Sequence, residues 1–73
     1  ASIDYSVGLE SQTIITLYNT YGEKVATLVN EVLKPGDYNL VINIDELGLS
    51  NGTYLYKFES GPYSETKQMV IAR

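Results

Sequence analysis

The sequence predicts an all-β fold, a sandwich of six to seven short antiparallel strands. Apolar and polar residues alternate over most of the chain, which is the period of a strand with one buried face. Gly, Pro and Asn interrupt this alternation about every eight to twelve residues, as turns do in small sandwiches. No segment keeps a helical period long enough to predict a full helix.

The first part of the chain contains three predicted strands. The alternating segment 3–7 is the first, and segment 13–18, rich in β-branched residues, is the second. A turn follows, in which Gly22 can adopt a positive φ. The third strand, 24–30, loses its alternation at the consecutive residues Leu28 and Val29, so we expect a bulge or an edge position there.

A proline and a glycine separate the third strand from the fourth. Pro35 presets φ and Gly36 supplies the positive φ of a type II turn. The fourth strand, 38–45, has the cleanest alternation of the chain. The connection after it has room for one helical turn, with Leu47 tucked beneath it.

An aromatic segment follows the turn formers at 50–52. Tyr54, Tyr56 and Phe58 share one face of the predicted strand, because alternate side chains of a strand share a face. We predict that these rings face inward, since large rings supply the buried area that a small domain needs. An outward-facing aromatic strip that stacks on sugars is the alternative.

The last strand runs from about residue 63 to residue 71. It completes an Ig-like arrangement, in which the inner faces of two sheets enclose the core. The predicted core consists of Tyr5, Val7, Ile15, Leu17, Val25, Leu28, Tyr38, Leu40, Ile42, Tyr54, Tyr56, Phe58 and Met69.

Composition excludes several classes of function. The 73 residues fit one domain, and the chain contains neither cysteine nor histidine, so it has no side chains for Ser-His-Asp triads, Cys-His dyads or ordinary zinc sites. A net charge of −4 without a basic cluster disfavours nucleic-acid binding. No apolar run reaches the roughly 20 residues of a transmembrane segment. We expect residues 1–73 to be a piece of a longer protein, cut at a domain boundary.

Three polar patterns have simpler interpretations than a site. Residues 51–53 match the N-glycosylation pattern, but a turn entering a strand accounts for them. Asn43, Asp45 and Glu46 could suggest calcium binding, yet they lack the spacing of a calcium loop. A catalytic carboxylate pair is not expected, because a cleft is hard to build in so small a domain. Four glutamates are scattered over separate strands and turns: Glu10, Glu23, Glu31 and Glu59.

Four segments together resemble a known family. Segment 13–25 resembles the V-x-L-x-I-Y-N strand and following turn glycine of type IX secretion C-terminal sorting domains, and segment 49–56 resembles their L-x-x-G-x-Y-x-Y box. Segment 65–73 resembles their closing K-x-M-V stretch, and segment 3–7 fits their first strand. The same features are similar to the Ig-like module of flagellar hook-capping proteins.

The resemblance implies a non-enzymatic C-terminal targeting module without a cofactor. It would direct a covalently joined N-terminal cargo domain through the periplasm and the outer membrane, to be secreted or held at the cell surface. The implied partners are the secretion translocon and a sortase-like peptidase of the outer membrane. The family's turn glycines correspond to Gly22, Gly36 and Gly52.

The closing segment is the candidate for recognition by the translocon, because a terminal strand at a sheet edge can accept a partner strand. Its candidate residues are Lys67, Met69, Val70, Ile71 and Arg73. The simpler interpretation is that Met69 and Ile71 complete the core and the two cations are solvated.

Two other functions remain open at this point. The chain could be an accessory Ig-like module of a secreted hydrolase that binds carbohydrate or spaces domains. It could also be a structural subunit that assembles by edge pairing, since sandwiches have open edges.

Overall fold

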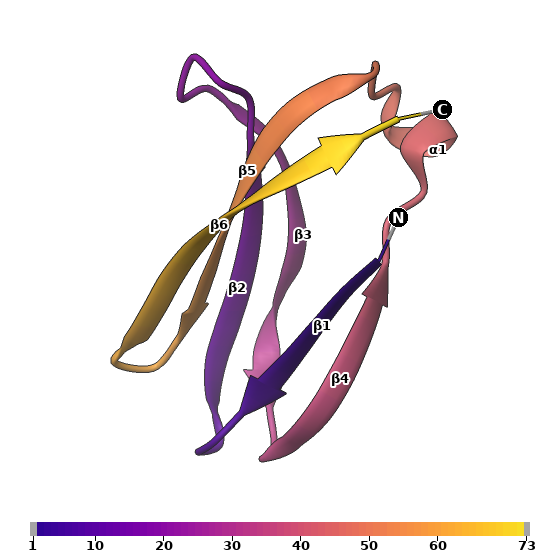
Figure 1. The fold of residues 1–73 in the computed structure, drawn as a ribbon. Coiled ribbons are helices and arrows are strands. Elements are labelled where there is room, and N and C mark those ends of the chain that lie inside the picture. Colours follow the sequence, from indigo (N-terminus) through magenta and orange to yellow (C-terminus); the bar gives the residue numbers. More distant parts are fainter. Residues whose placement is uncertain (1, 73) are drawn as a thin grey trace.

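The structure, a computed structural model that describes residues 2–72, consists almost entirely of β-strands (Figure 1). The sequence prediction of an all-β sandwich is confirmed, with six strands and one helical turn. In chain order the elements are β1 (Ser2–Val7), β2 (Ser11–Tyr18), β3 (Lys24–Leu33), β4 (Gly36–Val41), α1 (Ile44–Leu47), β5 (Gly52–Ser60) and β6 (Tyr63–Ile71).

The strands form two antiparallel sheets of unequal width. The larger sheet has the order β3-β2-β5-β6, and the smaller sheet contains β1 and β4. The chain therefore changes sheet three times, between β1 and β2, between β3 and β4, and through α1 between β4 and β5. Strands far apart in the sequence thus face each other across one core (Figure 1).

The core lies between the inner faces of the two sheets. Tyr54 and Phe58 are buried and Tyr56 is half-buried, so the predicted inward direction of the aromatic face is confirmed. The buried cluster also contains residues from both sheets and from the connection before β5: Ile3, Ile15, Leu17, Ile42, Leu49 and Ile71.

Two core predictions are wrong, each for a local reason. Val25 is 38% exposed. Leu17 pairs with Ala26 and Tyr18 pairs with Lys24, so the register of β2 against β3 leaves Val25 as an extra residue between them. Leu47 is also exposed, and Leu49, just after α1, fills the core in its place.

The predicted irregularity at Leu28 is confirmed. Ile15 pairs with Val29 and Thr16 pairs with Thr27, which leaves Leu28 as the extra residue of a bulge. Strand β3 is also an edge of the larger sheet, so both explanations of the lost alternation hold. The strand continues past the predicted end, to Leu33.

The predicted type II turn at Pro35 and Gly36 is wrong. Gly36 has φ of 155°, far from the roughly 80° that this turn requires, and it is already the first residue of β4. The pair belongs to the crossover between sheets, because β3 and β4 are not neighbours. Within the described part of the chain, no helix has the length and hydropathy to cross a membrane.

Candidate functional site

Strand β6 is an edge of the larger sheet and the first candidate for a recognition site. It pairs only with β5 among the strands of residues 2–72, from Ser60 opposite Tyr63 to Gly52 opposite Ile71. The register fixes the direction of its side chains. Residues opposite the buried side chains of β5 face the smaller sheet, and the residues between them face away.

The candidate recognition residues divide between the two faces of β6. Ile71 is buried and Met69 packs against the core cluster, so these two complete the core as the simpler interpretation predicted. Lys67 is exposed on the same inner face, opposite Tyr56. Val70 is 65% exposed on the outer face, and Arg73 lies outside the described residues.

Lys67 belongs to a polar row on the inner face of β6. The ammonium group of Lys67 lies 3.4 Å from the Oε1 atom of Glu65, and the Tyr63 hydroxyl donates a hydrogen bond of 2.5 Å to Glu65 Oε2. This hydrogen bond is the main cause of the lowered pKa of the Glu65 carboxyl, and it raises the pKa of the Tyr63 hydroxyl. The three side chains therefore form one ordered row above the core.

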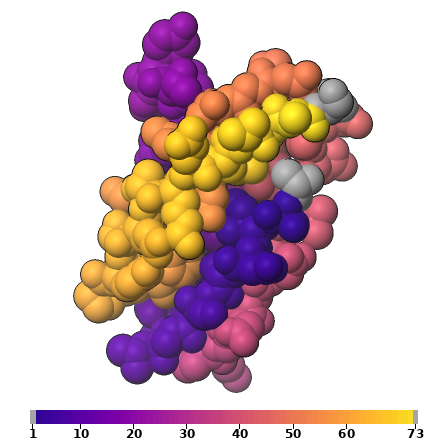
Figure 2. Space-filling model, viewed as in Figure 1, coloured from indigo at the N-terminus to yellow at the C-terminus, as the bar shows by residue number. Residues whose placement is uncertain are grey.

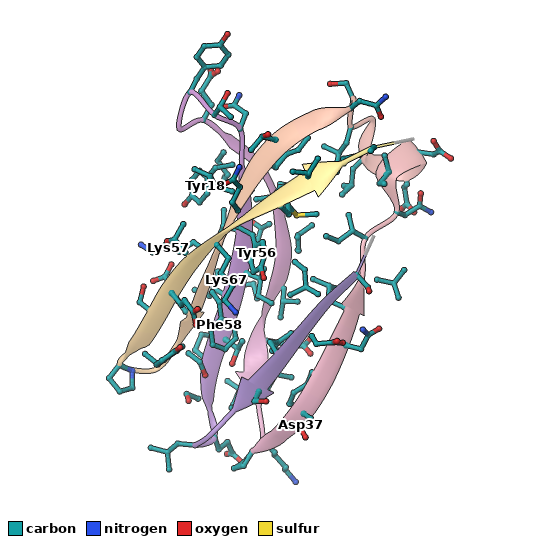
Figure 3. All side chains as sticks on the ribbon, in the orientation of Figure 1. Tyr18, Asp37, Tyr56, Lys57, Phe58 and Lys67 are labelled. Carbon is teal, nitrogen blue, oxygen red and sulfur yellow. The ribbon has the colours of Figure 1, made fainter. Side chains whose placement is uncertain are left out.

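A groove of about 770 Å³ lies beside this row, lined by both sheets. Its rings form a chain: Phe58 lies 5.8 Å from Tyr63 and 5.5 Å from Tyr5, between ring centroids. Tyr5 stacks on Tyr38 at 5.4 Å, and burial is the main cause of its raised pKa. In Figure 3, Tyr56, Phe58 and Lys67 lie close together on the inner side of β5 and β6.

Four predicted core residues also line this groove: Phe58, which is buried, and Tyr5, Tyr38 and Tyr56, which are half-buried. Tyr63 and Glu65 were not identified as site residues at all. The signal for them was weak, because only the register of β6 against β5 reveals that they share a face with Lys67.

The three glycines that the resemblance assigns to turns, Gly22, Gly36 and Gly52, all have positive φ. Gly22, at 83°, closes the turn between β2 and β3, whereas Gly52, at 149°, begins β5. Asn19, the last residue of the V-x-L-x-I-Y-N resemblance, organises the same turn. Its Oδ1 atom accepts hydrogen bonds from the backbone N–H groups of Tyr21 and Glu23, at 2.9 and 3.0 Å. An Asn that ends a strand just before a glycine turn is a usable signal for this role.

Asn43, Asp45 and Glu46 lie at the start of helix α1. The Oδ1 atom of Asn43 accepts a hydrogen bond of 3.0 Å from the backbone N–H of Glu46, which is the geometry of an N-cap. Among residues 2–72, no group of three or more acidic side chains is arranged to hold a metal ion. The segment therefore has a structural explanation that needs no ligand.

One comparison with known proteins identifies a family. The family model described as a secretion system C-terminal sorting domain matches residues 1–72. Comparison with curated proteins and with solved structures gives no match. The family match covers all the described elements, from β1 to β6.

Proposed function

The chain belongs to the family of secretion system C-terminal sorting domains, and from this premise we propose that β6 is the element that the export machinery recognises. A domain of this family is a non-enzymatic targeting signal of type IX secretion. It directs its cargo through the outer membrane, to the medium or to the cell surface. The carbohydrate-binding alternative is not favoured by this membership.

The position of β6 at a sheet edge is the observation that carries the proposal. An edge strand presents backbone N–H and C=O groups that a partner strand can pair with. Side chains then give specificity, and Val70 and Lys67 are available on opposite faces of the strand. Met69 and Ile71 hold the inner face of β6 against the core, so a partner would meet a rigid edge.

Residues 1–73 act in this proposal as one domain, joined to a cargo domain at the N-terminal side. A core shared by both sheets supports a single folding unit, since neither sheet buries its inner face without the other. The proposed partners of the domain, apart from its cargo, are the translocon and a sortase-like peptidase that separates the domain from the cargo. Catalysis belongs to these partners or to the cargo.

Two valine variants test the role of β6. Val70→Asp places a charge on the outer face of β6, and Val32→Asp does the same on β3, the opposite edge strand. The two valines are 65% and 61% exposed, so neither change disturbs the core. Each variant is fused behind a reporter and the surface-exposed reporter is measured in a bacterium with type IX secretion.

The proposal expects Val70→Asp to reduce surface delivery at least about tenfold, which corresponds to the loss of one well-placed contact. Val32→Asp should deliver as the unmodified chain does. Lys67→Glu is a second variant on the same strand and should also reduce delivery. Normal delivery of both β6 variants would refute recognition through this strand.

A further inference from the structure

Strand β6 is the more regular of the two edges of the larger sheet. Its pairing with β5 keeps one register from Tyr63 to Ile71, whereas the register of the other edge, β3, shifts at two places against β2. Such irregularities protect a sheet edge, because they twist the strand away from a further partner. In Figure 2 the gold and yellow atoms of β6 run uncovered across the face turned to the viewer. Strand β6 is therefore the edge of this sheet that accepts another strand more readily.

Every second residue of β6 directs its backbone groups toward this free edge. Ser60 and Tyr63 pair across a loop of two residues, and in such a hairpin the residues that flank the loop bond to each other. Along an antiparallel ladder the direction of the N–H and C=O groups alternates from residue to residue. The groups that point away from β5 therefore belong to the residues between the inner-face positions: Ser64, Thr66, Gln68 and Val70.

The inner-face side chains of β6 are chemically symmetric about Thr66. Glu65 and Lys67 lie on either side of it with opposite charges, and Tyr63 and Met69 flank the charged pair. The contact of 3.4 Å within the strand leaves the Glu65 side chain 40% exposed and the Lys67 side chain 56% exposed. Each charge can therefore take a second partner of opposite sign.

An antiparallel copy of β6 supplies those partners in one particular register. A two-fold axis at Thr66 places Glu65 opposite Lys67 of the other copy, and Tyr63 opposite Met69 of the other copy. Backbone bonds can form in this register, since the groups of Thr66 point to the free edge in both copies. A shift of the axis to Glu65 or to Lys67 would place two like charges directly opposite each other, which destabilises a strand pair. Charge thus selects this register over its two neighbours.

We propose that two copies of this chain pair through β6 about a two-fold axis at Thr66, which joins their four-stranded sheets into one continuous sheet. An inward-facing lysine normally discourages edge pairing, because an unrelated strand would cover its charge without compensating it. Here Glu65 of the other copy faces Lys67, and the four charges around the axis alternate in sign. The edge therefore fits a second copy better than it fits an unrelated strand.

Pairing would cover the same edge that the proposed function assigns to the export machinery. The dimer would then withhold β6, and the monomer would be the form that is exported. This consequence rests on the proposed function, whereas the pairing is a property of the 73-residue chain and can be measured without secretion. The contact is limited to one strand of each copy, so we expect a weak dimer with a Kd on the order of 0.1 mM.

An exchange of the two charges tests the register. Association is measured by sedimentation equilibrium at low salt, at chain concentrations up to about tenfold above the expected Kd. Glu65→Lys and Lys67→Glu should each weaken association at least about tenfold, because each places like charges opposite each other. The double variant restores opposite charges across the axis, so its Kd should return to within about threefold of that of the unmodified chain.

Lys57 and Glu59 provide the matched control. They form a second ion pair of the β5–β6 hairpin, at 3.9 Å, and their side chains are 41% and 42% exposed on the outer face of β5. Lys57→Glu and Glu59→Lys change the net charge of the chain as the two β6 variants do, but they lie away from the free edge. Each should change the Kd of association by less than about threefold.

Thr66→Pro tests the backbone contact. Proline removes an N–H group that points to the free edge and leaves the bonds to β5 in place, which edge strands tolerate. The variant should lose association, whereas Thr66→Val keeps the N–H group and should associate as the unmodified chain does. If Thr66→Pro does not fold, the charge variants decide alone. No association of the unmodified chain, no recovery in the double charge variant, or equal association of Thr66→Pro and Thr66→Val would overturn the proposal.

The two proposals fail in distinguishable ways. Val70 lies beyond residues 63–69, which pair in the dimer, so Val70→Asp should associate as the unmodified chain does. No association, together with lost export of Val70→Asp, would refute the pairing and leave recognition through β6 intact. Association of the unmodified chain, together with normal export of Val70→Asp and Lys67→Glu, would support the pairing and refute the role of these β6 side chains in export.

Discussion

At the residue scale, two hydroxyl groups join neighbouring strands inside the larger sheet. The Thr13 and Ser60 hydroxyl oxygens lie 3.1 Å apart, and both residues are buried. Ser60→Ala would remove this hydrogen bond and leave Thr13 with only the longer bond, 3.3 Å, to the Ser11 carbonyl. We expect the free energy of unfolding to fall by about 1 kcal/mol, measured by urea denaturation.

Ser64→Ala is the control for this change, because Ser64 is exposed on β6. Its effect should stay within about 0.5 kcal/mol. A Ser60→Ala protein as stable as Ser64→Ala would mean that the buried hydroxyl pair adds nothing to the stability of the fold.

The Tyr63–Glu65 hydrogen bond should make the stability of the fold depend on pH. It holds the pKa of Glu65 below its ordinary value of 4.5. The contribution of the ionised carboxylate to stability is therefore present above pH 4.5 and is lost as the pH falls through the lowered folded-state pKa. Tyr63→Phe removes the donor, so the pKa of Glu65, followed by NMR titration, should rise toward 4.5.

A pKa of Glu65 that is the same in Tyr63→Phe as in the unmodified chain would contradict this assignment. It would leave Lys67 as the group responsible for the shift, because its ammonium is the other partner of the carboxylate. Lys67→Met distinguishes the two causes, since it removes the ammonium and keeps the Tyr63 donor.

At the scale of single elements, the turn between β2 and β3 depends on a backbone conformation that favours glycine. Gly22 has φ of 83°, and a Cβ atom added there would meet nothing within 4 Å. Any cost of Gly22→Ala therefore comes from the left-handed conformation itself. We expect a loss of about 1–2 kcal/mol in the free energy of unfolding, measured by urea denaturation.

Gly8→Ala provides the comparison, because Gly8 is equally unobstructed and is not among the glycines with positive φ. This change should leave stability within about 0.5 kcal/mol of the unmodified chain, or raise it slightly. If the two variants lose the same stability, the conformation of Gly22 is not what the turn requires.

The elements also show how far sequence reasoning can reach. Alternation and turn residues identified all six strands, and the inward face of β5 followed from the spacing of its rings. The bulge at Leu28 could be predicted because two apolar residues are consecutive. The second shift, near Val25, is marked less clearly, because the consecutive apolar residue there is the small Ala26.

The groove is beyond sequence reasoning for a different reason. Tyr5 and Tyr38 meet through the pairing of β1 with β4, and Phe58 joins them from the other sheet. Local alternation assigns each ring to an inner face correctly. Local alternation does not predict the distance between the two sheets. That distance decides whether a ring on an inner face is enclosed or lines an opening.

At the scale of the whole molecule, the unequal width of the sheets is the main feature. Two strands cover four, so the core is closed at one end by Ile42, Leu49 and Ile71 and remains open toward Tyr63 and Lys67. A domain built in this way is a folded sorting signal whose sheet edge and groove are both open to solvent.

The most direct test of this account measures surface delivery of a reporter joined to the 73 residues. The fusion is expressed in a bacterium with type IX secretion and in the same strain without its translocon, and the reporter outside the cell is quantified by protease shaving. The account predicts surface reporter only in the strain with the translocon. Equal delivery in both strains, or retention of a folded fusion inside both, would contradict it.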